Sequence, residues 1–367
     1  MPVIKHRRAI IFALIFGILM LSSLARSQEK KQDPPKKEEE MATIRLDTDL
    51  VTLEVAVTDR DGKRSNTGLR AEDFVIYEDG VRQKVASFQT ADVPFNLVLL
   101  MDTSGSTRDD VGLMRRAALR FLDELRPQDR LAVVQFNKQV ELLKDLTASH
   151  AKIEEALSLL KPGTGTSFYD ALQLTVDDVF GKVEGRKAII ALTDGVDSYG
   201  YQTYEEILPV LEKNNISLYF LELDTESFTE AGMKRDCTNE SHFEFSSKQL
   251  TKFFQDHGRA GAASFLMGHC TIPAAERVQI NHLLYASARR ELREMADKTG
   301  GRVYPVKQLQ QLDAVYAQIA AELHTLYSVA YYPANEKHDG KWRKIRVEVK
   351  RPGFTARTRS GYRAPLN

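Results

Sequence analysis

Apolar runs that alternate with amphipathic segments fill the middle of this chain, and this alternation limits its possible folds more than any other feature. Four runs are almost entirely apolar: 95–101, 130–136, 187–192 and 216–223. Runs of this kind are typical of strands covered on both faces, as in parallel sheets. Between them, apolar residues recur at helical spacing over 109–125, 153–160, 169–180 and 204–213. The alternation predicts an α/β fold with a doubly wound, mostly parallel sheet.

Two parts of this region depart from simple alternation. Val140–Leu146 follows Phe136 too closely for a crossover, so we expect it to pair antiparallel at a sheet edge. Residues 225–280 interrupt the alternation and show no clear period. The elements expected after them are a helix over 283–299, a strand at RVYPV and a final helix over 308–326.

Short alternating runs flank the α/β region on both sides. Asp79-Gly80 supplies a hairpin turn in the first flank, and Asp339-Gly340 supplies a turn in the second. With about three strands each, neither flank offers much core, so we expect the two to pair into one β-sandwich. We expect Tyr331, Tyr332 and Trp342 to lie in its core. The predicted divisions are an N-terminal β unit over 43–92, the α/β domain over 93–326 and a C-terminal β unit over 327–367.

The first 42 residues resemble a targeting segment and a linker. Basic residues precede an apolar run from Ala9 to Leu21, and Ala25 and Ser27 suit cleavage. We therefore expect a secretory signal peptide over 1–27, a charged linker over 28–42, and a secreted or periplasmic protein. The alternative is an uncleaved membrane anchor, but the run is shorter than the roughly 20 residues of a spanning helix. Membrane contact is expected only through this segment, if it is uncleaved.

Net charge limits the classes of partner, and the cysteine content limits the possible disulfides and metal sites. Lys and Arg together number 51, as do Asp and Glu, so no net field attracts nucleic acid, and we expect none as a partner. The only cysteines are Cys237 and Cys270. In an oxidising compartment they could form a disulfide. Free thiols and a metal site with nearby histidines stay open, although the spacing differs from that of structural zinc sites.

Oxygen-bearing side chains follow the apolar runs. Asp102 comes directly after the first run, with Ser104 and Ser106 at alternating positions; Thr166 precedes a predicted helix, and Asp194 follows the run 187–192. Because loops at the carboxyl ends of parallel strands share one sheet edge, we expect these side chains to converge. Carboxylates and hydroxyls are hard donors that suit Mg²⁺, with Ca²⁺ or Mn²⁺ as alternatives. Helix capping is the simpler explanation for any one of these residues.

The motifs DTSGS, Gly165-Thr166 and TDG resemble the metal-ion-dependent adhesion site of von Willebrand factor A domains, over about 95–326. LRAEDFVIYEDG, TGGRVY, YSVAYYP and RKIRVEVKR are similar to a bacterial group of these proteins common in acidobacteria. The resemblance implies that Asp102, Ser104, Ser106 and Thr166 bind the metal, and that Asp194 acts directly or through a water. It also implies a protein-binding function, in which an Asp or Glu carboxylate of a protein partner replaces a metal-bound water.

Enzymatic alternatives lack their motifs. An aspartyl phosphotransferase needs a second Asp two residues after Asp102, where Ser104 stands. Neither Ser104 nor Ser106 has the glycine two residues before it that a nucleophile elbow requires, and no glycine-rich phosphate loop with lysine occurs. We therefore expect no enzyme activity. A structural component of an envelope or secreted complex, whose metal stabilises the fold, remains the main alternative.

Overall fold

The structure is a computed structural model that describes residues 50–59, 68–90, 93–235, 243–256 and 271–366. The expected signal peptide and linker, and both Cys237 and Cys270, lie outside the described residues. The questions of cleavage and of a disulfide therefore stay predictions.

A six-stranded sheet forms the centre of the α/β region, in the order β10-β9-β8-β5-β6-β7. Its strands are β5 (Phe95–Asp102), β6 (Arg130–Phe136), β7 (Val140–Thr147), β8 (Arg186–Thr193), β9 (Ile216–Leu223) and β10 (Arg302–Val306). All neighbours are parallel except β6 and β7, which form the expected antiparallel edge pair. The strand order reverses beside β5, so the predicted doubly wound, mostly parallel sheet is confirmed.

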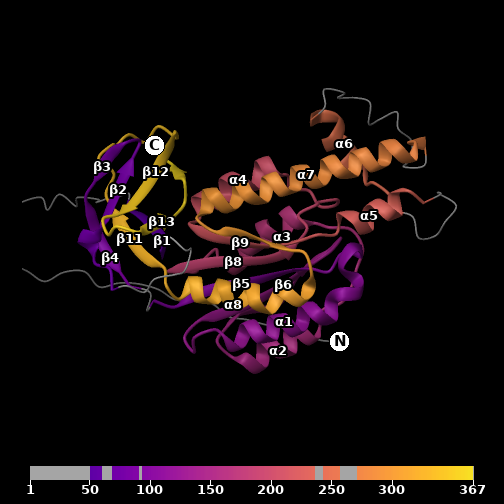
Figure 1. Ribbon diagram of the computed structural model, residues 1–367, viewed down its shortest axis with the longest axis horizontal. Coiled ribbons are helices and arrows are strands. Elements are labelled where there is room, and N and C mark those ends of the chain that lie inside the picture. Colours follow the sequence, from indigo (N-terminus) through magenta and orange to yellow (C-terminus); the bar gives the residue numbers. More distant parts are fainter. Residues whose placement is uncertain (1–49, 60–67, 91–92, 236–242, 257–270, 367) are drawn as a thin grey trace, which may run out of the picture. The chain divides into compact units, whose positions relative to one another are not determined.

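Helices cover both faces of this sheet (Figure 1). On one face lie α1 (Val111–Asp123), α2 (His150–Ser158) and α8 (Leu312–Leu323); on the other lie α3 (Phe168–Leu174), α4 (Tyr204–Lys213) and α7 (Ala274–Thr299). Successive side chains of β5 alternate between the two cores: Leu97 and Leu99 pack with α1, and Val98 and Leu100 with α3. A strand buried on both faces has no polar face, which explains its continuous apolar sequence.

The segment after β9 forms helices of its own. These are α5 (Glu226–Met233) and α6 (Ser247–Asp256), which pack on the N-terminal part of α7. α7 begins at Ala274 rather than at the expected Leu283. The N-terminal part of α7 buries Ile280 and Leu284 against Phe245 and Leu250, in a small core separate from the sheet. Because this part of α7 does not face the sheet, the sheet-facing period did not predict it.

The two flanks build one β-sandwich, as expected, with two strands from each flank in each sheet. One sheet has the order β13-β1-β11-β4 and the other β14-β12-β2-β3. The N-terminal strands are β1 (Val51–Asp59), β2 (Phe74–Glu78), β3 (Val81–Gln83) and β4 (Val85–Gln89). The C-terminal strands are β11 (Tyr327–Tyr331), β12 (Trp342–Val349), β13 (Phe354–Arg357) and β14 (Gly361–Arg363). Neither flank contains enough strands to form this sandwich alone.

Each flank supplies four strands, whereas we expected three. The run after Asp79-Gly80 divides at Lys84, so that β3 pairs in one sheet and β4 in the other. The run from Phe354 divides in the same way into β13 and β14. Strands that bend and change sheets form the corners of such sandwiches. Tyr331 is fully buried, but Tyr332 is 53% exposed, because β11 ends before it and its side chain lies outside the core.

The sandwich contacts the α/β region at the amino ends of the parallel strands. Arg186, at the start of β8, donates from Nε to Oε2 of Glu54 on β1 at 2.8 Å. Its guanidinium also lies 4.0 Å from the ring centroid of Phe95. Since the sandwich contacts one edge of the sheet, the carboxyl ends of the strands and their loops lie at the opposite edge (Figure 1).

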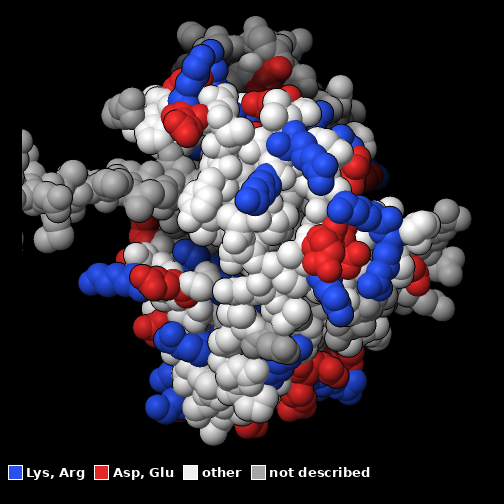
Figure 2. All heavy atoms as spheres, turned by 90° about the vertical axis from the view of Figure 1, so that its left-hand side faces the viewer, with Lys and Arg blue, Asp and Glu red and all other residues white. Residues whose placement is uncertain are grey.

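The surface on the sandwich side mixes charges of both signs. Figure 2 shows Lys and Arg interspersed with Asp and Glu, with no broad area of one sign among the described residues of this face. A mixed surface exerts little long-range attraction on a polyanion. Within the described ranges, no helix combines the length and the apolar character needed to cross a membrane.

Candidate metal centre

Three loops meet at the carboxyl edge of the central sheet. Side chains of Ser104, Ser106, Thr166 and Asp194 line a common cavity of about 710 Å³. Asp102 lies beneath them, fully buried, and its Oδ1 accepts a hydrogen bond from the Ser104 N–H at 3.0 Å. The structure thus brings together the five residues that the sequence predicted to converge, four at the cavity and one below it.

The first loop holds its donors by local hydrogen bonds. The Thr107 hydroxyl donates to the carbonyls of Asp102 at 2.9 Å and Ser104 at 3.1 Å. The backbone N–H of Thr103 donates to the carbonyl of Phe136 at 2.8 Å, which fixes the loop to β6. As a result the hydroxyl oxygens of Ser104 and Ser106 lie 3.1 Å apart. Two hydroxyls are therefore held side by side above Asp102.

The second loop depends on a glycine in the left-handed region. Gly165 has φ +68°, and a β-carbon there would lie 2.4 Å from the ring of Tyr199. This conformation and close approach both favour glycine. The N–H of Thr166 donates to the Ser198 hydroxyl at 2.9 Å, and the Thr166 carbonyl accepts from Tyr199 N–H at 2.8 Å. Thr166 is thereby fixed to the third loop through its backbone, with its side chain at the cavity.

The third loop links the two carboxylates. The Thr193 hydroxyl donates to Oδ2 of Asp102 at 2.7 Å and accepts from the Gly195 N–H at 3.0 Å. Asp194 follows, and its Oδ1 accepts from the N–H of Val196 at 3.0 Å. The Ser106 hydroxyl donates to Oδ2 of Asp194 at 3.3 Å. A continuous set of contacts therefore joins Asp102, Ser104, Ser106 and Asp194.

The carboxyl groups of Asp102 and Asp194 are both buried at this site. Burial, together with the nearby charge of Asp194, raises the pKa of Asp102 to about 7. Burial also raises the pKa of Asp194, although hydrogen bonds from Thr225, Val196 and Ser106 oppose the shift. Like charges in a medium of low dielectric constant repel strongly, and a cation between them would relieve that repulsion. Among the residues that the structure describes, no group of three or more His, Cys, Asp and Glu could hold a metal.

The donors present fit a hard divalent cation. Two carboxylates and three hydroxyls supply oxygen only, which suits Mg²⁺, Mn²⁺ or Ca²⁺ better than a cation that prefers sulfur or imidazole. Mg²⁺ commonly keeps several waters when few carboxylates bind it. The open cavity above the hydroxyls leaves room for such waters or for an incoming ligand.

Two further hydroxyls, which the sequence analysis did not single out, contact Asp194. Thr225 Oγ1 donates to Oδ2 of Asp194 at 2.5 Å, and the Tyr285 hydroxyl does so at 3.3 Å. Thr225 and Tyr285 are themselves 2.8 Å apart. Thr225 lies just after β9 at the same sheet edge, so the rule that predicted Asp194 could also have found it. Tyr285 gave no such signal, because it lies in the part of α7 that packs outside the sheet.

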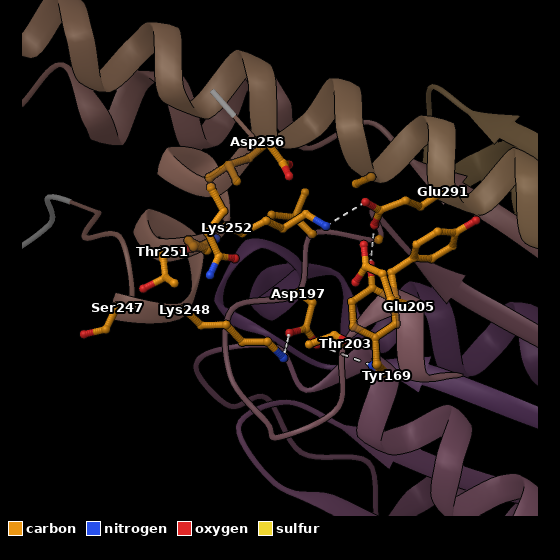
Figure 3. A pocket seen from close by; sticks show the side chains of 17 residues that line it. Tyr169, Asp197, Thr203, Glu205, Ser247, Lys248, Thr251, Lys252, Asp256 and Glu291 are labelled. Atoms are coloured by element: carbon orange, nitrogen blue, oxygen red, sulfur yellow. Dashed lines mark hydrogen bonds and ion pairs between the residues drawn. The ribbon is translucent and has the colours of Figure 1, made fainter. Parts of the chain in front are cut away.

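A second cavity, of about 440 Å³, lies beside the third loop, between α4, α6 and α7 (Figure 3). Lys248 Nζ of α6 is 2.5 Å from Oδ2 of Asp197, and Lys252 Nζ is 2.7 Å from Oε1 of Glu291. Asp197 also accepts from the N–H of Phe168 at 2.7 Å, at the start of α3. Burial raises the pKa of Asp197 to about 6, while Lys248 lowers it. Both lysines have acidic partners, so they do not offer an anion site. The ion pair between Lys248 and Asp197 instead connects α6 to the third loop of the metal site.

Comparison with known proteins agrees with this geometry. Residues 96–256 match the family described as the von Willebrand factor type A domain. Domains of this family commonly mediate protein interactions through a metal-ion-dependent adhesion site, and most are not enzymes. Over 112 residues the chain is 31% identical to sll0103, an uncharacterized protein of Synechocystis. That match covers 29% of this chain and 27% of the relative, so the chain spans only about a quarter of that protein's length.

Several solved structures are similar. Proximal thread matrix protein 1 from the mussel byssus matches with a TM-score of 0.44 and 15% identity, over 67% of this chain and 50% of that one. Another structure of the same mussel protein, with a zinc-occupied adhesion-site motif, has a TM-score of 0.43 and 15% identity, over 67% and 49%. BatB from Bacteroides thetaiotaomicron has a TM-score of 0.39 and 17% identity, over 63% of this chain and 98% of BatB. The match to the von Willebrand factor type A domain, over residues 96–256, includes all five residues of the candidate metal centre.

Proposed function

We propose that this protein is an exported binding protein that holds a divalent cation at Asp102, Ser104, Ser106, Thr166 and Asp194 and uses it to capture a carboxylate of a protein partner. One observation carries the proposal: two buried carboxylates and two adjacent hydroxyls are joined in one set of contacts at the floor of an open cavity, which Thr166 also lines. Buried charges are normally paired in a folded protein, and here the missing partner is positive.

The hydrogen bonds around each carboxylate suggest different roles. The two oxygens of Asp102 each accept one protein hydrogen bond, which leaves a lone pair on each for a cation. Oδ2 of Asp194 is approached by the hydroxyls of Ser106, Thr225 and Tyr285. We therefore assign Asp102 to direct coordination and Asp194 to holding a metal-bound water. Mg²⁺ is the first candidate, with Mn²⁺ or Ca²⁺ as alternatives.

A site that holds a dication can capture a partner because of the positive charge of that cation. A dication facing two carboxylates and neutral hydroxyls can still accept an oxygen donor in its open position. A carboxylate there replaces a neutral water with a charged ligand and requires no bond cleavage. The same exchange gives reversible binding that a chelator abolishes. This family commonly binds protein partners, which supports a protein as the source of the carboxylate.

Metal titration tests the site directly. Isothermal titration of the chain with MnCl₂ and with MgCl₂ should show one cation per chain, and Asp102→Ala should show none. Asp177→Ala, which removes an exposed carboxylate on the segment after α3, should bind the cation normally and serves as the control. Equal affinities for native chain and Asp102→Ala would exclude the proposed site.

A second candidate function is a structural one, in which the cation only stabilises the fold. The complete burial of Asp102 beneath the first loop favours it. The two functions differ in EDTA: a structural cation is needed for folding, whereas a binding site leaves the chain folded without metal. We expect a cooperative thermal transition in EDTA, well above 37 °C by the usual range of mesophilic domains. An unfolded chain in EDTA would favour the structural function.

Export is the part of the proposal that rests on the N-terminal sequence alone. The basic, apolar and small-residue order of residues 1–27 supports a cleaved signal peptide. Expression of the full chain in a Gram-negative bacterium, followed by fractionation and mass spectrometry, tests it. We expect a periplasmic product that begins at Gln28; an intact chain in the membrane fraction would indicate the anchored alternative.

A further inference from the structure

An apolar wall stands on one side of the metal-site cavity. It is built from the segment after β9, which departs from the regular alternation of the domain. The residues that line the cavity from this side include Phe228, Met233, Phe243 and Phe245. The oxygen donors Ser104, Ser106, Thr166 and Asp194 line the same cavity. One cavity therefore combines a charged subsite with an apolar one.

The wall is fixed by close packing. Phe228 and Phe243 form an edge-to-face pair with ring centroids 5.4 Å apart. Phe243 lies directly on the backbone of α5, since a β-carbon added at Gly232 would be 1.8 Å from its ring. Met233 and Phe245 are buried beneath, in the small core that joins α5, α6 and α7. Phe228 alone of this pair presents a large free surface, with 50% of it exposed.

The wall is also tied to the proposed metal site. Thr225, the residue before α5, donates its hydroxyl to Asp194, and Phe228 follows three residues later. Three residues of helix rise by about 4.5 Å, so the apolar surface begins about one helical turn from the charged subsite. Tyr285 contacts both Asp194 and Thr225, and Thr229 donates to the Tyr285 hydroxyl at 3.3 Å. The spacing between charged and apolar subsites is therefore set by the fold.

This spacing selects a kind of partner. In an extended peptide, neighbouring α-carbons are about 3.8 Å apart, and side chains two positions apart share one face. A carboxylate at the metal and an apolar side chain on Phe228 can therefore come from residues one or two positions apart. An exposed aromatic surface beside a polar site is a common anchor for a partner's aromatic or aliphatic side chain.

We propose that the partner presents an Asp or Glu flanked, within two positions, by a large apolar side chain that packs on Phe228. This inference rests on the proposed metal-dependent function and adds the specificity element to it. A carboxylate alone would meet the cation but leave the wall exposed. Discrimination among the many acidic segments of other proteins then comes from the apolar contact rather than from the charge.

Selection from a random peptide library tests the proposal. Phage-displayed peptides are captured on the chain in Mg²⁺, eluted with EDTA and sequenced. On the native chain we expect enrichment of an acidic residue together with Phe, Leu, Ile, Met or Trp one or two positions away. On Phe228→Ser the acidic residue should remain enriched and the apolar neighbour should not. Tyr332→Ser is the control, because Tyr332 is 53% exposed on the distant sandwich and should leave both enrichments unchanged.

The outcomes separate the two proposals. Acidic enrichment without an apolar neighbour on the native chain overturns the inference but leaves metal-dependent capture standing. Absence of any acidic peptide among those eluted with EDTA overturns both.

Measured affinities give a second, independent readout. For one selected peptide, fluorescence anisotropy should show about tenfold weaker binding to Phe228→Ser, as for loss of an aromatic anchor. Phe228→Leu should recover part of the loss, because leucine restores apolar area. Mn²⁺ affinity should be the same for both variants. Equal peptide affinity in Phe228→Ser and native chain would overturn the role of Phe228, and lost Mn²⁺ binding would overturn its independence from the metal site.

Discussion

Buried charged groups are arranged differently at the two ends of the parallel strands of the central sheet, called here the amino edge and the carboxyl edge. At the amino edge, where the sandwich is attached, Glu54 is paired with Arg186 at 2.8 Å, and Glu322 is paired with Arg357. At the carboxyl edge, Asp102 and Asp194 are both acidic and have no cationic side chain among their described hydrogen-bond partners. The first arrangement is complete within the chain, whereas the second needs a cation from solution.

The pKa shifts express the same difference. Burial raises the pKa of Glu54 and lowers that of Arg186, but each is opposed by attraction to the other. At the carboxyl edge, burial and repulsion act in the same direction on Asp102. A buried pair of opposite charges marks a structural joint, while buried like charges mark a place where something binds.

The largest effect is expected at the amino edge. Arg186→Ala leaves Glu54 buried without its partner, and we expect the free energy of unfolding to fall by about 3–5 kcal/mol. Urea unfolding followed by circular dichroism measures it. The double variant Glu54→Leu with Arg186→Met should recover most of the loss, because no buried charge remains. A loss below about 1 kcal/mol for Arg186→Ala would show that the joint does not depend on this pair.

At the carboxyl edge, removing a charge should have little effect without metal. In EDTA, we expect Asp102→Asn to change the free energy of unfolding by less than about 1 kcal/mol, because relief of repulsion offsets a weakened hydrogen bond. The native chain should gain about 2.7 kcal/mol in Mg²⁺ at one hundred times its Kd, and the variant should gain much less. Urea unfolding with and without Mg²⁺ gives both numbers. The same gain in both proteins would place the stabilising cation elsewhere.

The sequence predicted the carboxyl edge better than the sandwich, for a physical reason. Asp102 lies directly after one apolar run and Asp194 two residues after another, and parallel strands bring such positions to one edge whatever the rest of the fold does. The corner between β3 and β4 has no comparable signal, because a strand that bends into a second sheet keeps the same apolar alternation. Pairing of the two flanks was predictable from their lack of core, but the interleaving of β1 with β11 and β13 depends on tertiary contacts.

The irregular segment 225–280 is the part of the chain whose structure the sequence predicted least. Its helices pack on α7 in a small core, so no period relates them to the sheet. Phe228, Phe243 and Tyr285 were therefore indistinguishable from ordinary apolar residues in the sequence. Thr225 was the exception in principle, since it follows β9 as Asp194 follows β8. The oxygen donors that follow the strands were thus predictable, and the residues that the irregular segment and α7 add around them were not.

Tyr285→Phe tests how far α7 supports the metal site. The variant removes a hydroxyl that contacts Asp194 at 3.3 Å and leaves the ring in place. Groups that orient metal ligands typically contribute ten- to a hundredfold to affinity, and this long contact should lie near the lower value, at about tenfold. Mn²⁺ titration by calorimetry measures the change. In contrast, Tyr316→Phe alters a buried tyrosine of the opposite core and should leave the affinity unchanged.

The smallest effect on stability is expected from Asp129, a carboxylate at the amino edge that accepts several hydrogen bonds. Burial raises the pKa of Asp129, but hydrogen bonds from His324 and the N–H groups of Phe95 and Arg126 outweigh it, so the pKa lies below its ordinary 3.8. A lowered carboxyl pKa adds stability above the unfolded value, which is lost as the pH falls through the folded value. Asp129→Asn should therefore cost about 1 kcal/mol at pH 7, by the scale of such hydrogen bonds, and progressively less below pH 4.

Urea unfolding of both proteins from pH 7 to pH 3 follows this convergence, with Asp145→Asn, an exposed carboxylate on β7, as the control. If the difference between native chain and Asp129→Asn instead grew as the pH fell, the folded state would bind the proton more tightly than the unfolded state. Asp129 would then resemble Asp102, and the contrast between the two edges would lie in the bound cation alone, not in how the chain itself arranges its buried charges.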